Sequence, residues 1–150
     1  MVVPIIKISD SKDIPAVFEL ESHYMAELEP HNFERWKACE AVHRKRMEDV
    51  LQRTFVAEIA DEIKGYCYWG LKNESAHIFN VYVHPDFRRY GLAKYLLERT
   101  EEDIQRKGFS HWTFCPIKTH PAKVFIEQLG YKFQGEDTQR LHMTKERAAA

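Results

Sequence analysis

One short stretch of the chain places three basic side chains around a glycine and an alanine at the start of a helix. Arg88, Arg89 and Lys94 surround Gly91 and Ala93, and the apolar run before them is typical of a β-strand. The first turn of a helix leaves about four backbone N–H groups without intrahelical partners and carries a partial positive charge. Because small residues let an anion approach these groups, the stretch predicts a phosphate-binding turn.

The residues that follow have the spacing of an amphipathic helix. Small and apolar side chains recur on one stripe at positions 93, 96, 97, 100 and 104. Two other phosphate-binding motifs are excluded, because a Rossmann fingerprint needs three glycines and a P-loop needs Gly-Lys-Ser/Thr. On these residues alone, a plain helix start without a ligand stays open as the alternative.

Two longer strings carry a resemblance to a known family. Residues 81–93 contain Val-x-Val-x-Pro and then Arg-x-x-Gly-x-Ala, which resembles the acyl-CoA signature of the GNAT superfamily of N-acetyltransferases. Residues 121–133 resemble that family's C-terminal element, usually Ala-x-x-Phe-Tyr-Glu-x-x-Gly-Phe. This second string predicts a helix from Ala122 to Leu129, with Gly130 just past its end, where a left-handed residue is favoured.

The resemblance implies an α/β (α+β) fold with a mixed, mostly antiparallel sheet whose strands are splayed at the acyl-CoA site. About six or seven strands and roughly four helices are expected around one core. Hydrophobic patterns predict strands at 1–8, 54–60, 63–71, 76–83, 111–115, 131–134 and 139–144, and helices at 12–28, 33–52, after residue 91 and at 122–129. We expect a single domain over 1–147, with 148–150 as an added tail.

Composition narrows the function classes. The 150 residues are 44% hydrophobic and 30% charged, which is ordinary for a globular domain and excludes a disordered chain. A net charge of −1 gives no general attraction to nucleic acid or to an anionic membrane, so neither partner is predicted. Three scattered cysteines argue against a disulfide framework and predict a cytoplasmic protein. Cys39 and His43 have helical metal spacing without a second pair, so no metal is expected.

The cosubstrate implied by the resemblance is acetyl-CoA. Pantetheine would pair with the main chain of Val81 and Val83 like an added strand, and the pyrophosphate would meet the N–H groups of residues 88–93. Thr119 stands where many members carry an asparagine, and Phe125 stands where an aromatic or leucine flanks the cofactor. Core packing is the alternative for Val81, Val83 and Phe125. The predicted cofactor contacts are Val81, Tyr82, Val83, Arg88, Arg89, Tyr90, Gly91, Leu92, Ala93, Lys94, Thr119 and Phe125.

The resemblance fails at the proton donor for the departing thiolate. Many members use a tyrosine at the position of Ile126. Either the thiolate leaves unaided, since a thiol pKa is near ~8.5, or another group donates; Cys115, His120 and Tyr24 stay open. If protonation limits the reaction, Ile126→Tyr should raise turnover.

Two residues are candidates for the catalytic base. His77 lies eleven residues before Arg88, where histone-modifying members of the family carry a glutamate. A histidine with a pKa near ~6.5 can accept a proton at neutral pH. Glu21 lies within the apolar stripe of the first helix, where a carboxylate is costly unless it is paired or functional. A histidine on a polar strand face and an ion-paired glutamate are the respective alternatives.

The acceptor is less defined than the cofactor. Residues 10–34 carry seven acidic side chains and one lysine, which would favour a cationic amine if these helices roof the pocket; a solvated helix face is the alternative. The expected function is transfer of an acetyl group to a primary amine, of a small molecule or a protein, directly within a ternary complex. A non-catalytic acyl-CoA-binding or sensing domain is the rival, and a homodimer stays open.

Overall fold

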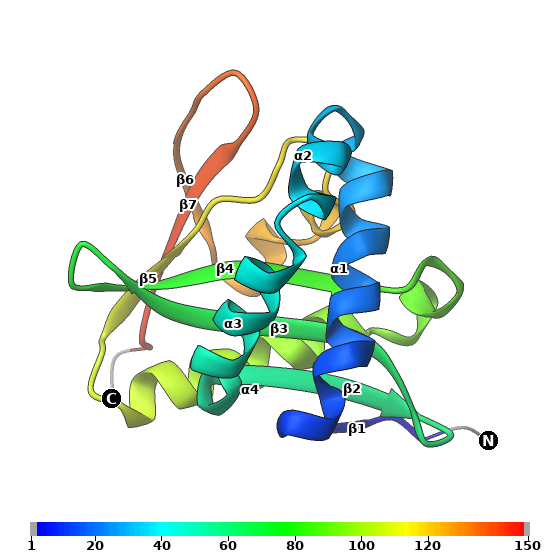
Figure 1. The fold of residues 1–150 in the computed structure, drawn as a ribbon. Helices are drawn as coiled ribbons and strands as arrows, with labels where there is room; N and C mark the ends of the chain where they lie inside the picture. The colour runs from blue at the N-terminus through cyan, green and yellow to red at the C-terminus, as the bar shows by residue number, and fades with distance from the viewer. Residues whose placement is uncertain (1–2, 149–150) are drawn as a thin grey trace.

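Residues 3–148 are described by a computed structural model, in which one seven-stranded sheet lies between two layers of helices (Figure 1). The strand order is β1-β2-β3-β4-β5-β7-β6. Only β4 and β5 pair in parallel; the other neighbours are antiparallel, which confirms the predicted mixed fold. The strands are β1 (Ile5–Ile8), β2 (Thr54–Ile59), β3 (Glu62–Lys72), β4 (Ser75–Val83), β5 (His111–Phe114), β6 (Lys132–Glu136) and β7 (Leu141–Glu146).

The helices are divided between the two faces of the sheet. Those on one face are α1 (Ile14–Leu28), α2 (Phe33–Lys37) and α3 (Glu40–Asp49), and α4 (Leu92–Arg106) covers the other face (Figure 1). Short 3-10 turns lie at Ser11–Asp13, Pro30–Asn32, Leu51–Arg53, Pro85–Tyr90, Pro121–Val124 and Glu127–Leu129. Within residues 3–148, no helix is long and apolar enough to cross a membrane.

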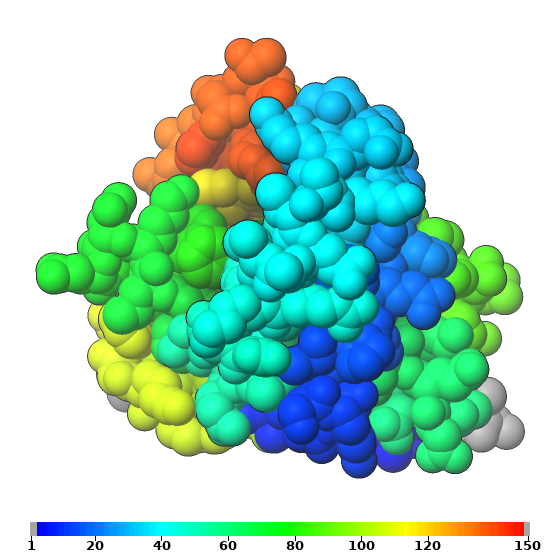
Figure 2. All heavy atoms as spheres, in the orientation of Figure 1, coloured from blue at the N-terminus to red at the C-terminus, as the bar shows by residue number. Residues whose placement is uncertain are grey.

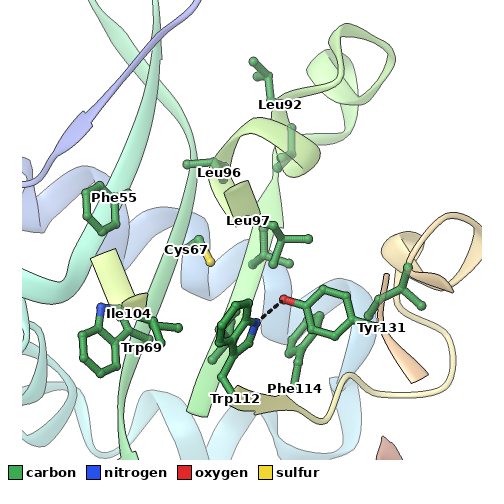
Figure 3. Close-up of a cluster of buried hydrophobic side chains, with 14 of the residues drawn as sticks. Phe55, Cys67, Trp69, Leu92, Leu96, Leu97, Ile104, Trp112, Phe114 and Tyr131 are labelled. Atoms are coloured by element: carbon green, nitrogen blue, oxygen red, sulfur yellow. Dashed lines mark hydrogen bonds between the residues drawn. The ribbon is translucent and has the colours of Figure 1, made fainter. Parts of the chain in front are cut away.

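The larger hydrophobic core lies between the sheet and α4. Leu92, Leu96 and Leu97 of α4 pack into it, together with Trp112 and Tyr131 (Figure 3). The indole of Trp112 donates to the hydroxyl of Tyr131 over 3.1 Å, and that hydroxyl donates to a carboxylate oxygen of Glu101 over 2.6 Å. The polar atoms of this core are therefore satisfied, which keeps their burial from costing stability.

The sheet opens between β4 and β5. These strands pair only at His77–Thr113 and Ile78–Phe114, and no further pair is formed toward Val83. On the other edge of β4, the register with β3 shifts between Tyr68 and Trp69, so that Phe79 is an extra residue in β4. A β-bulge bends a strand and increases its twist, so this one contributes to the divergence of β4 from β5.

The predicted helix over residues 122–129 is wrong. Two separate 3-10 turns occupy this region, and the backbone of Phe125 between them leaves the helical region at φ −130° and ψ −1°. Ile126 packs into the core and Ala122 is buried at the wall of the gap, while the segment is too short for helix propagation to hold it against such anchoring. The left-handed conformation expected for Gly130 is present, with φ 95°.

The predicted helix over residues 33–52 is also broken. It divides into α2 and α3 at Cys39, whose φ of −109° and ψ of 33° are not helical. Trp36 and Met47 are the buried residues of the two helices. With so few apolar anchors, packing does not enforce one continuous helix. At the chain ends, the predicted first strand starts at Ile5, while its residues 1–2 and residues 149–150 of the predicted tail lie outside the described residues.

Candidate cofactor and acceptor site

A cavity of about 260 Å³ fills the opening between β4 and the segment that follows β5. Residues 81–83 of β4 form one wall, and residues 120–125 form the other. Val124 at its mouth is 82% exposed, although its side chain is apolar. An apolar wall next to unpaired strand edge suits an extended ligand with both amides and methylene groups.

No side chain of the described residues caps the N-terminus of α4 in the place where an anion could bind. Gly91, the residue before the helix, adopts φ 72°. The first backbone bond of the helix is made by the N–H of Tyr95 to the carbonyl of Gly91, over 3.3 Å. The N–H groups before it are those that a phosphate would satisfy.

A second cavity, of about 480 Å³, opens at this helix start. It shares Arg88, Ala93 and Phe125 with the first cavity and adds the basic side chains of Arg89 and Lys94. The two cavities therefore describe one continuous path, from the apolar gap to a positively charged helix end. Such a path matches a molecule with an apolar-amide arm and a phosphate head.

Most of the predicted cofactor residues lie along this path. Those that line one or both cavities are Val81, Tyr82, Val83, Arg88, Arg89, Gly91, Ala93, Lys94 and Phe125. Leu92 is fully buried in the core, and Tyr90 and Thr119 are exposed outside both cavities. The structure thus brings most of these residues together, while contact of each residue with a cofactor stays a prediction.

Arg88 is held by a residue that the sequence reasoning missed. Its guanidinium donates to both carboxylate oxygens of Glu27 in α1, over 2.8 and 2.6 Å, and its Nε donates to the carbonyl of Val83 over 3.0 Å. The Tyr82 hydroxyl also donates to Glu27, and these contacts lower the pKa of that carboxyl. Arg88 therefore fixes the turn to α1, and no local sequence signal links two residues so far apart in the chain.

His120 closes the inner end of the gap. Its Nδ1 accepts from the N–H of Ala122 over 3.0 Å, so its Nε2–H donates to the carbonyl of Val81, 2.6 Å away. Burial lowers the pKa of His120 to about 4. The ring is therefore neutral at pH 7, and its one N–H is already used.

His77 lies on the opposite face of β4 from the α4 core. It is 5% exposed, and its Nδ1 is 2.6 Å from the hydroxyl oxygen of Thr113. Burial, with the positive charges of Lys72 and Arg140, lowers the pKa of His77 to about 4. It does not line the 260 Å³ cavity, so it would reach an acceptor on the α1 side of the sheet.

Glu21 is part of an ion pair. Its carboxylate accepts from the Trp36 indole over 2.9 Å and from Arg46 over 2.5 Å. It belongs to the buried face of α1 and lines neither cavity of the cofactor path. This position matches the ion-paired alternative, and a catalytic role for Glu21 stays a prediction.

Five of the seven acidic side chains between residues 10 and 34 are held in ion pairs or a helix cap, and Glu19 and Glu34 are outside this set. Glu21, Glu27 and Glu29 are each paired with an arginine, at Arg46, Arg88 and Arg140 respectively. Asp10 and Asp13 form a capping box at the start of the first helical turn. A recess on this side of the molecule is bounded by α2 and α3 in cyan, the β3–β4 hairpin in green and the β6–β7 hairpin in orange (Figure 2).

The residues considered for protonation of the thiolate differ in their acidity and in their position relative to the gap. The Tyr24 hydroxyl donates to Glu29 over 2.7 Å, and burial with this carboxylate raises its pKa, which makes it a weaker acid. Ile126 is 1% exposed within the α4 core and does not line the gap. Cys115 is half-buried directly after the last β4–β5 pair.

Across residues 3–148, no group of three or more metal-ligating side chains could hold an ion.

Known proteins share this fold. The family described as acetyltransferase (GNAT) domain matches residues 51–133, more than half of the chain. A search of curated protein sequences gives no match. Many solved structures share the fold, at low sequence identity.

Three of these structures illustrate the likeness. The PaiA N-acetyltransferase of Thermoplasma acidophilum, solved with coenzyme A, has 15% identity and a TM-score of 0.82 over 96% of this chain and 99% of that one. A GCN5-related N-acetyltransferase of Rhodopseudomonas palustris has 19% identity and a TM-score of 0.79 over 96% of each chain. The putative acetyltransferase yncA of Salmonella typhimurium, solved with acetyl-CoA, has 16% identity and a TM-score of 0.71 over 98% of this chain and 95% of that one. With its splayed sheet and its uncapped helix start, the chain belongs to the GNAT family of acetyltransferases.

Proposed function

We propose that this acetyltransferase moves the acetyl group of acetyl-CoA to a primary amine by direct transfer in a ternary complex. The observation that carries the proposal is the continuous path from the β4–β5 gap to the uncapped start of α4. Similar structures were solved with coenzyme A and with acetyl-CoA. The pantetheine arm would lie along Val81–Val83, and the pyrophosphate would meet the helix start beside Arg89 and Lys94.

The main chain of Val81 supplies a group for the transition state. In a β-strand the N–H and C=O of one residue point to the same side, and the Val81 carbonyl points into the gap toward His120. The Val81 N–H therefore faces the same gap. A backbone N–H aimed at the thioester carbonyl would stabilise the oxyanion of the tetrahedral intermediate.

The electrostatics near His77 favour a neutral amine. Burial, and after it the positive charges of Lys72 and Arg140, lower the pKa of His77, and the same positive charges would lower the pKa of an amine placed beside it. A deprotonated amine is the form that attacks a thioester. His77 is neutral at pH 7, and its pKa of about 4 makes it a weak base. It would accept the proton of an amine whose own pKa is lowered by these charges, directly or through a water molecule.

The thiolate of coenzyme A would leave without a tyrosine donor. Tyr24 is a weakened acid and the single N–H of His120 is bound to Val81. Because a thiolate is a good leaving group at neutral pH, direct departure is compatible with turnover.

The acceptor is proposed only as an amine class, a small molecule or a protein amine. Because Glu21, Glu27 and Glu29 are paired with arginines, the structure gives little support to selection by a strongly negative pocket. The three free cysteines fit a reducing compartment, and we propose the cytoplasm.

A thiol-release assay with acetyl-CoA over a panel of small amines and peptides tests the proposal. Turnover with an amine, together with a product that carries the acetyl group on nitrogen, supports it. Thermal stabilisation by acetyl-CoA without turnover across the panel would favour the rival, a non-catalytic acyl-CoA sensor. Absence of stabilisation by acetyl-CoA would contradict both.

A further inference from the structure

A cysteine, a histidine and an aspartate are hydrogen-bonded in series next to the closed end of the β4–β5 gap, where the last pair of the two strands is formed. The Sγ of Cys115 is 3.4 Å from Nδ1 of His142, and Nε2 of His142 is 2.9 Å from Oδ2 of Asp137. The other oxygen of Asp137 accepts from the N–H groups of Gln139 and Arg140, each over 2.8 Å. The order of groups is that of a nucleophile, a base and the residue that orients the base.

The orienting contact sets which nitrogen of the imidazole carries the proton. These contacts lower the pKa of Asp137 to about 2, so it is a carboxylate near neutral pH. A carboxylate can only accept, and Nε2 of His142 must therefore carry the hydrogen that it donates. Nδ1 is then left as an acceptor, facing the thiol of Cys115.

The thiol lies beside the closed end of the gap, toward which a thioester bound along Val83–Val81 would point, although Cys115 lines neither cavity of the cofactor path. Cys115 follows Phe114, the last residue of β5 that pairs with β4. Since Phe114 points into the α4 core, strand alternation directs Cys115 to the opposite face, the face on which His77 lies. Arg140 supports the position, because its Nη1 donates to the carbonyl of Cys115 over 3.0 Å.

The other two cysteines of the chain have different surroundings. Cys39 is exposed at the break between α2 and α3, and Cys67 is fully buried in the α4 core, where burial raises its pKa to about 12. Cys115 is half-buried and faces an imidazole. Burial also raises the pKa of Cys115, so its proton would be removed by His142 during attack.

We propose that Cys115 is an S-acylation site that accepts the acyl group of an acyl-CoA thioester bound in the gap. The proposal rests on the acetyl-CoA binding proposed above. The Cys115 sulfur forms a bond to the acetyl carbon, and the bond from that carbon to the coenzyme A sulfur breaks. The proton of the thiol goes to Nδ1 of His142 and then to the departing coenzyme A thiolate.

The reaction exchanges one thioester for another, so it is close to balanced in free energy and reversible. The acetylated enzyme would accumulate when acetyl-CoA is abundant and an amine acceptor is absent. Free coenzyme A would remove the acetyl group by the reverse steps. Cys115 thus competes with the amine for the same acyl group and reports the ratio of acetyl-CoA to coenzyme A.

Intact-protein mass spectrometry after incubation with acetyl-CoA, without an amine, tests the proposal. We expect one added acetyl group, located on Cys115 by peptide mapping, labile to hydroxylamine and reversed by excess coenzyme A. Cys115→Ala should abolish it, and Cys39→Ser should leave it unchanged. His142→Gln should slow its formation by roughly 10²-fold, since a general base is lost.

Asp137→Asn tests the positioning role of that residue. An asparagine amide can donate to Nε2, which would move the imidazole hydrogen to Nδ1 and away from its accepting role. The dependence of acylation rate on pH should then change, whereas a merely structural role would leave its shape intact. The charged and titratable groups around the thiol are Lys72, Arg140, His77, His142 and Asp137.

Two results would overturn the inference. The first is thermal stabilisation by acetyl-CoA with no acetyl group on Cys115. The second is equal labelling of Cys39 and Cys115 that is insensitive to His142→Gln, which marks uncatalysed transfer from solution. Neither result affects the proposed N-acetyltransferase, which fails instead if acetyl-CoA does not bind or no amine is acetylated.

Discussion

The cofactor path differs from the proposed acceptor face, which is the α1 side of the sheet where His77 lies. The difference is in which polar groups lack a partner within the protein. Along the path, the N–H groups at the start of α4 have no capping side chain and the edge of β4 toward β5 is largely unpaired. On the acceptor face, Glu21, Glu27 and Glu29 are each neutralised by an arginine. Unsatisfied backbone groups indicate where a ligand binds, whereas paired charges stabilise the fold. Charge count alone therefore misleads about the acceptor.

Disrupting the start of α4 should have the largest effect on the binding of acetyl-CoA. Gly91→Val introduces a side chain at φ 72°, a conformation that costs an L-residue roughly 1–2 kcal/mol, and it places a branched group where the phosphate would lie. We expect thermal stabilisation by acetyl-CoA to be abolished. The measurement is the difference in Tm of the variant with and without acetyl-CoA.

Gly108→Val is the matched control, because Gly108 has φ 99° at the far end of α4 and open space around it. Both variants should lose similar stability without ligand, and only Gly91→Val should lose the response. An undiminished response in Gly91→Val would place the pyrophosphate elsewhere.

Breaking the pair between Glu21 and Arg46 tests whether the acceptor face is structural. Replacing Glu21 by Gln leaves a half-buried guanidinium without its anion, and loss of one partner of a buried pair costs about 3–5 kcal/mol. We expect lower stability in urea denaturation and little change in kcat/KM of the folded enzyme. A large fall in kcat/KM at undiminished stability would instead make Glu21 catalytic.

His120 should make folding sensitive to acid. Its pKa is about 4 in the folded protein and near ~6.5 in the unfolded chain. The unfolded state therefore binds more protons between these values, so this stability is complete above about pH 6.5 and is lost as pH falls toward 4. The difference amounts to about 3 kcal/mol. Tm followed from pH 7 to 4 should fall less for His120→Gln than for the wild type, whereas parallel curves would contradict the assignment.

Removing the proposed base should lower activity by roughly 10²-fold, or about 3 kcal/mol. His77→Ala leaves the cofactor path intact, so kcat/KM should fall while stabilisation by acetyl-CoA persists. Because burial and nearby cations lower the pKa of His77 to about 4, the wild-type rate should lose this base only below that pH. His43→Ala is a control outside the sheet. Equal profiles for His77→Ala and wild type would make His77 structural.

The sequence predicts the cofactor path better than it predicts the contacts of the acceptor face. The helix start at Gly91, the strands of the meander and the left-handed Gly130 are set by residues next to one another, so their patterns predict them. The contacts of Glu27 with Arg88 and of Cys115 with His142 join distant segments, and nothing local encodes them. The prediction of a helix at 122–129 is wrong for a related reason, since burial of Ile126 in the core and of Ala122 at the cavity wall overrides the helical pattern.

The smallest effect on turnover is expected for Ile126→Tyr, and the structure corrects the expectation from the sequence that this variant could gain activity. Its side chain points into the core and not into the gap, so a tyrosine there cannot present a hydroxyl to the thiolate. Ile126→Tyr should cost about 1–3 kcal/mol through overpacking and give no gain in turnover. The neighbouring Phe125 lines both cavities, and Phe125→Tyr is therefore the variant that adds a hydroxyl to the path at little cost in stability. Turnover and urea denaturation of the two variants measure this difference. Faster turnover in Ile126→Tyr would show that this segment rearranges when the cofactor binds.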